Sequence, residues 1–158
     1  MLTPAQLTTL KAAILADPAV NTKVSGTGTD YEFIANYLSA PASPAFTVWV
    51  SNLTPDLARS GVLGGIAQLD NLTVGKRDAL LYLFAATNDC RNAAVRQAID
   101  DLCGTQNTLK ASLLVAEKRL ANRAEKILAT GTGSDAVPAI TTFEGSINAL
   151  DIGGILAA

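Results

Sequence analysis

The sequence predicts a mainly α-helical fold, a helical bundle that ends in an extended, β-type C-terminal arm. Apolar residues recur every three or four positions through the second half of the chain, which is the spacing of one helix face. Five of the six prolines precede residue 56, and after Gly133 the composition becomes β-type. We therefore predict a helical domain over residues 1–133 and an arm over 134–158.

The first half of the chain carries two clear helix starts. Thr3 before Pro4 and Thr54 before Pro55 each combine an N-cap residue with proline at the first helical position. Thr29 or Asp30 is the predicted cap of another, short helix. Proline and glycine residues interrupt the segments between the predicted helices. These starts predict helices over about 4–17, 31–38 and 55–59, with residues 39–52 as a strand or a pinned loop.

The second half contains the predicted core helices, at about 74–87, 92–103 and 107–129. The last of these carries the longest apolar stripe, with Asn107 as its N-cap and Gly131 closing it. Its stripe consists of Leu109, Leu113, Ala116, Leu120, Ala124 and Ile127. Short connections predict that these three helices pack as antiparallel neighbours.

The polar side of the predicted 107–129 helix is basic, with five lysines and arginines against Glu117 and Glu125. The candidate basic face consists of Lys118, Arg119, Arg123 and Lys126. Such a face suits DNA phosphates, but the whole chain carries a net charge of −2. A solvated face or a protein contact is the preferred interpretation.

The predicted arm has a composition that favours pairing with another strand. Residues 135–158 carry β-branched and aromatic side chains and are too apolar for a disordered tail. A lone strand needs an edge to pair with, in its own chain or in a neighbour. The candidate assembly residues are Val137, Ile140, Thr142, Phe143 and Ile147, and we predict that this arm drives assembly.

The sequence lacks the residue combinations that most enzyme active sites use. The chain has no histidine and only two cysteines, Cys90 and Cys103, so it offers neither a Ser-His or Cys-His pair nor a closed zinc site. The glycine-rich segments 26–30 and 131–135 lack the P-loop lysine and are interpreted as linkers. We predict a protein that is not an enzyme and needs no cofactor or metal.

Membrane insertion and export are not expected either. No apolar run approaches the length of a membrane span, and the N-terminus lacks a basic segment followed by an apolar one. Cys90 and Cys103 are expected to stay reduced, as in proteins made in the cytoplasm.

Four segments resemble small virion proteins of tailed bacteriophages, those of the head-to-tail connector or adaptor. They are MLTPAQL (1–7), LSAPASPAF (38–46) followed by Val48-Trp49, DNLTVGKRDAL (70–80), and RAEKILATGTG (123–133) leading to Phe143-Glu144-Gly145. Together they span nearly the whole chain, and their specificity lies in their combination and order. The glycine-rich segment 61–69 departs from the more aromatic form that such sequences carry.

The resemblance implies a helical subunit that forms a homo-oligomeric, twelvefold ring below the portal. The protein would be made in the host cytoplasm and located in the virion. Its partners would be the portal and other neck or tail proteins, with non-specific contact to packaged DNA also allowed. Alternatives are another capsid or tail completion protein, or a nucleic-acid-binding regulator that uses the basic face.

Overall fold

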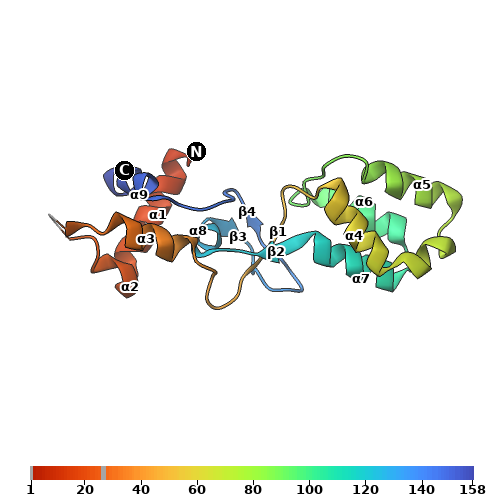
Figure 1. The fold of residues 1–158 in the computed structure, drawn as a ribbon, viewed down its shortest axis with the longest axis horizontal. Helices are drawn as coiled ribbons and strands as arrows, with labels where there is room; N and C mark the ends of the chain where they lie inside the picture. The colour runs from red at the N-terminus through yellow and green to blue at the C-terminus, as the bar shows by residue number, and fades with distance from the viewer. Residues whose placement is uncertain (1, 26–27) are drawn as a thin grey trace. The chain divides into compact units, whose positions relative to one another are not determined.

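The computed structural model describes residues 2–25 and 28–158 and is mainly helical, which confirms the predicted fold class. The chain forms two compact units (Figure 1), one of residues 1–48 and 120–158 and the other of residues 49–119. Strand β1 (Thr47–Trp49) pairs with β2 (Lys118–Leu120), and the chain passes between the units within these two strands. We call the units unit 1 and unit 2.

Unit 1 joins the two ends of the chain. Its helices are α1 (Pro4–Ala16), α2 (Pro18–Asn21), α3 (Tyr31–Ser39), α8 (Arg123–Ile127) and α9 (Ala149–Ala157). Strands β3 (Ala129–Thr130) and β4 (Ile140–Thr141) pair antiparallel, with Ala129 opposite Thr141. Fully buried side chains from both chain ends form its core: Leu10, Ile14, Val20, Ile34, Ile152 and Ile155.

The predicted starts of the unit 1 helices are confirmed by their caps. Thr3 forms a capping box with Gln6, and Pro4 takes the first helical position of α1. Asp17 ends α1 and also caps α2, where its side chain accepts a hydrogen bond from the Ala19 amide. Asp30 caps α3 through the Phe33 amide. Gly26 and Thr27 of the first glycine-rich linker lie outside the described residues.

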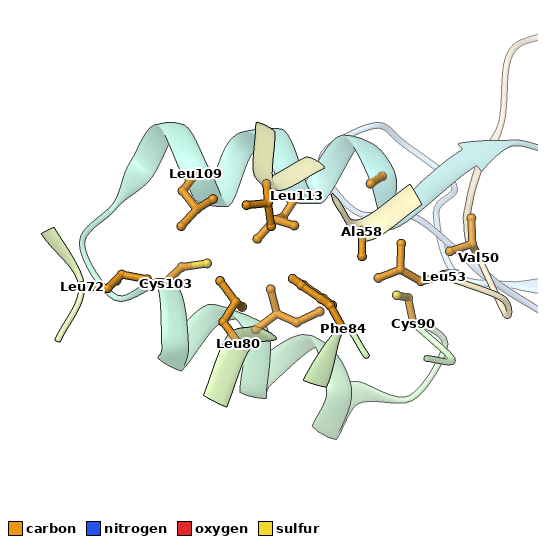
Figure 2. Close-up of a cluster of buried hydrophobic side chains, with 13 residues drawn as sticks. Val50, Leu53, Ala58, Leu72, Leu80, Phe84, Cys90, Cys103, Leu109 and Leu113 are labelled. Carbon is orange, nitrogen blue, oxygen red and sulfur yellow. The ribbon is translucent and has the colours of Figure 1, made fainter. Parts of the chain in front are cut away.

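Unit 2 is a continuous segment of four α-helices and a 3₁₀ helix. The elements are α4 (Pro55–Gly64), η2 (Ile66–Asn71), α5 (Val74–Leu83), α6 (Ala93–Cys103) and α7 (Asn107–Ala116). Figure 2 shows Leu109 and Leu113 of α7 pointing into the cluster that also contains Leu80 and Phe84. Cys90 and Cys103 lie at opposite ends of this cluster in the same view, and both thiols are free.

Helix α4 continues past the predicted end at Arg59 because its glycines face α7. A side chain at Gly61 would meet a Leu113 methyl group at 3.0 Å, and one at Gly65 would collide with the backbone of Leu109. The glycines therefore permit close packing of α4 on α7. The prediction took them as helix breakers because their packing partner lies about fifty residues further along the chain.

The single helix predicted over 107–129 is wrong. Helix α7 ends at Ala116, and the backbone then pairs with residues 46–50 instead of with itself. The Val50 amide donates to the Glu117 carbonyl oxygen at 2.9 Å, and the Ala121 amide donates to that of Phe46 at 2.8 Å. A new capping box, Asn122 with Glu125, then starts α8. Leu120, expected on the buried stripe, is 65% exposed.

The extended arm predicted over 134–158 is also wrong in its last third. Residues 149–157 form α9, which begins at a capping box between Asn148 and Asp151. The pair Gly153-Gly154 weakens a helix by about 1 kcal/mol each. Burial of Ile152 and Ile155 against α1 and α3 offsets that cost.

Candidate functional site

The five candidate assembly residues do not form one exposed strip. Val137 and Ile140 are 59% and 39% exposed, and Thr142 is exposed, where it accepts a hydrogen bond from the Gln6 side chain. Phe143 is half-buried against the unit 1 core, and Ile147 is part of that core. Of the five candidates, only Val137, Ile140 and Thr142, which lie in β4 or within three residues of it, are therefore exposed.

Polar contacts fasten the segment between β4 and α9 to unit 1. One carboxylate oxygen of Glu125 accepts a hydrogen bond from the Gly145 amide at 3.1 Å, and the other accepts from the Asn122 amide at 3.0 Å. The Ser39 hydroxyl bonds both the amide and the carbonyl oxygen of Ile147. These contacts are internal to unit 1, so residues 145–147 are a structural part of the subunit.

The candidate basic face does not exist as a helix face, because its residues belong to different elements. Lys118 and Arg119 lie in β2, whereas Arg123 and Lys126 lie in α8. The Arg123 guanidinium stacks 4.0 Å from the centre of the Tyr37 ring and donates to the Tyr37 carbonyl oxygen. Lys126 lies over the Phe46 ring at 5.7 Å. The latter two cations thus serve packing within unit 1.

A polar pocket in unit 2 is the site that the sequence did not predict. It has a volume of about 340 Å³ and lies between α6 and α7, beside the β1 residue Trp49. We call it the Glu117 pocket; its lining consists of Trp49, Ala93, Arg96, Gln97, Asp100, Lys110, Leu114 and Glu117.

The basic residues of the Glu117 pocket already have partners. The Lys110 ammonium lies 2.9 Å from the Asp100 carboxylate. The Arg96 guanidinium stacks 4.6 Å from the centre of the Trp49 ring and donates to the Cys90 carbonyl oxygen. Both cations therefore have partners other than Glu117, although the Lys110–Asp100 pair is partly exposed to solvent.

Glu117 is different from its neighbours. It is only 5% exposed, and among the described residues no hydrogen bond or ion pair to its carboxyl group is found. Burial, and secondly the Asp100 charge, raise the pKa of Glu117 from 4.5 to about 7, against the opposing charges of Arg96 and Lys110. The pocket therefore contains a carboxyl group that is half ionised near neutral pH.

One feature of the sequence points to the burial of Glu117. It follows Leu109 and Leu113 at intervals of four, so it continues the apolar stripe of α7. The prediction counted it among the charges of the polar side, because charged residues are seldom buried. The spacing alone therefore identifies Glu117 as a buried position. That its carboxyl group has no partner in the protein can be seen only in the structure.

Among residues 2–25 and 28–158 no cluster of three potential metal ligands occurs. None of the described helices has the length and hydropathy of a membrane span. No family model, curated protein or solved structure matches this chain.

Proposed function

We propose that this protein is a structural subunit of a tailed-phage virion, a head-to-tail connector that forms a ring below the portal. The proposal rests on the resemblance of four segments in their order along the chain. In this proposal the neighbours of the subunit are the portal and other neck or tail proteins, and the protein catalyses no reaction. The subunit surface makes the contacts.

A structural feature that supports the proposal is that each unit exposes large apolar side chains. In unit 1 these are Val137 and Ile140, beside and within β4. In unit 2, Leu57 and Val115 are 40% and 68% exposed and flank a groove between α4 and α7 that is lined by small residues. Apolar side chains that are exposed next to one another, in contrast to single ones, mark surfaces that are covered on assembly.

A closed ring requires two different contact surfaces on each subunit. In a closed ring the contact is heterologous, so one patch of each subunit meets a different patch of the next. A twofold dimer instead uses the same patch twice. The two apolar surfaces, one in each unit, therefore support a ring more directly than a dimer.

The test is the mass of the assembled protein in solution, measured by light scattering and native mass spectrometry. We expect a ring of about twelve subunits, or ring formation on addition of the portal. Val137→Asp combined with Ile140→Asp should abolish the ring, and so should Val115→Asp by itself. Each change places a charge where an apolar contact is expected.

Thr8→Asp is the matched control, since it adds the same charge at an exposed position of α1. This variant should assemble like the wild type. A monomer that stays monomeric with the portal present would contradict the connector proposal. Assembly that survives both surface changes would show that other surfaces make the contacts.

A further inference from the structure

We infer that the Glu117 pocket binds a cationic nitrogen group, a guanidinium or an ammonium, and that the Glu117 carboxylate is its counter-ion. The group belongs either to a small molecule or to a lysine or arginine side chain of a second copy of this chain. This inference does not depend on the connector proposal.

The first argument is that the Glu117 carboxyl group has solvent but no protein donor beside it. The residue is only 5% exposed, yet no described side-chain oxygen is both fully buried and without a partner, so its oxygens are reached through the pocket. No described residue supplies a donor, although the group lines a pocket of about 340 Å³. An N–H donor entering this pocket would supply the missing bonds.

The second argument is that the neighbouring cations are held elsewhere. Lys110 is paired with Asp100, and Arg96 is held by the Trp49 ring and the Cys90 carbonyl oxygen. Neither lies within 4.0 Å of a Glu117 oxygen. Both cations of the pocket lining are thus paired with other groups, and the Glu117 carboxyl group can accept a cation from a ligand.

The third argument concerns the sign of the ligand charge. The charged groups that influence Glu117 are Asp100 and Arg96 of α6 and Lys110 of α7. The Cys90 and Cys103 thiols are neutral near pH 7, because burial raises their pKa values to about 12 and about 11. Burial, the largest cause, and the Asp100 charge both oppose ionisation of Glu117, so a positive charge placed beside this carboxyl group stabilises its ionised form.

A pH dependence of binding follows from this arrangement. A cation binds the ionised form of Glu117, so at low pH binding must release a proton. The affinity should therefore rise about tenfold between pH 6 and pH 8 and level off above. An anion held by Arg96 and Lys110 would show the opposite trend, because it prefers the neutral carboxyl group.

The experiment uses Trp49, the only tryptophan of the chain, as a reporter inside the pocket. The full-length protein is titrated with methylguanidinium chloride and with methylammonium chloride at pH 6, 7 and 8. Sodium chloride keeps the ionic strength constant, and the tryptophan emission and the indole N–H resonance are recorded. We expect saturable changes with the pH dependence described above.

Glu117→Gln keeps the size of the side chain but removes its charge, so it should weaken binding at pH 8 at least tenfold. The matched control is Glu32→Gln, the same change at an exposed position of α3, which should bind like the wild type. The absence of saturable binding at pH 8 would overturn the inference. So would an affinity that falls with pH, or one that survives Glu117→Gln.

A second measurement separates the two sources of the cation. If a basic side chain of another copy fills the pocket, Glu117→Gln should lower the oligomeric mass, and the two probes should compete with assembly. If the ligand is a small molecule, the mass should stay unchanged while probe binding is lost. A normal mass with normal probe binding in Glu117→Gln would contradict both.

Discussion

Two buried glutamates eight residues apart, Glu117 and Glu125, have opposite surroundings. Glu125 is 2% exposed and accepts hydrogen bonds from the Asn122 and Gly145 amides, so its burial fastens one segment to another. Glu117 is 5% exposed, lines a pocket and has no such donor among the described residues. The difference shows that burial by itself says little about the role of a carboxyl group.

The donors around each carboxyl group decide the role. Backbone amides at the start of α8 are part of the fold, so they make Glu125 a structural residue. At the end of α7 the backbone offers carbonyl oxygens, and an amide donor for Glu117 must come from elsewhere. We therefore expect changes at Glu125 to affect stability, and changes at Glu117 to affect pH dependence and binding.

The largest effect is expected from removing α9. A chain that ends at Asn148 lacks Ile152 and Ile155, both fully buried in the unit 1 core. Each loss costs about 2 to 5 kcal/mol, which together approaches the whole stability of a domain. Hydrogen exchange of the α1 and α3 amides should become fast. Unchanged protection would show that the Glu125 contacts alone hold unit 1 together.

Glu125→Ala should have the next largest effect, about 3 to 6 kcal/mol of unfolding free energy. It leaves two backbone amides without their charged acceptor, and bonds of this kind contribute about 1.5 to 3 kcal/mol each. Urea unfolding measures the loss. Glu125→Gln keeps one acceptor oxygen, so it should lose about half as much, and an equal stability of all three proteins would contradict the structural role.

Glu117→Gln should change how stability depends on pH. The raised pKa means that the folded protein binds the Glu117 proton more tightly than the unfolded chain does. The stability from this group is present below about pH 4.5 and is lost as the pH rises to about 7, by about 3 kcal/mol in total. The free energy of unfolding of Glu117→Gln, relative to that of the wild type, should therefore rise by about 3 kcal/mol between pH 4.5 and pH 8. A constant difference would contradict the raised pKa.

Glu32→Gln should have the smallest effect and gives the reference for the two buried residues. Glu32 is exposed in the first turn of α3, where a negative charge interacts favourably with the helix dipole. Its loss should cost about 0.3 to 0.5 kcal/mol at low salt, and less at high salt. Thermal unfolding at two salt concentrations measures it, and a cost above 1 kcal/mol would mean that exposed glutamates are poor references here.

Local patterns in the sequence were sufficient for most helix starts. Thr3-Pro4, Asp30 and Thr54-Pro55 start helices where they were expected, because a cap depends on a few adjacent residues. Asn107, predicted as an N-cap, is instead the first residue of α7, which has no side-chain cap. The end of α6 at Cys103 also depends on an adjacent residue, because Gly104 adopts a positive φ of 57° after it.

The two largest errors involve partners that are distant along the chain. A smaller one is the end of α5, which lies at Leu83 instead of the predicted residue 87. Residues 117–121 leave the helical path because residues 46–50 offer backbone partners. The segment 145–157 folds into unit 1 because α1, α3 and Glu125 receive it. Apolar spacing cannot distinguish such pairing from a longer helix or a free arm. The Asn122 and Glu125 capping box was nevertheless visible in the sequence as a second helix start.

The candidate site was therefore only partly predictable. The sequence identified Val137 and Ile140 as apolar residues of a β-type segment, and they are exposed. It could not identify the Glu117 pocket, because that pocket combines β1, α6 and α7. The pairing of Lys110 with Asp100 and of Arg96 with Trp49 depends on the same packing.

The most direct test of the contrast between the two glutamates is a carbon NMR titration of the side-chain carboxyl groups. The chain contains only four glutamates, Glu32, Glu117, Glu125 and Glu144, so their resonances can be assigned from single Glu→Gln variants. One glutamate should titrate at about pH 7, and that resonance should be missing from Glu117→Gln. A Glu117 carboxyl group that titrates near its ordinary value of 4.5 would contradict the account.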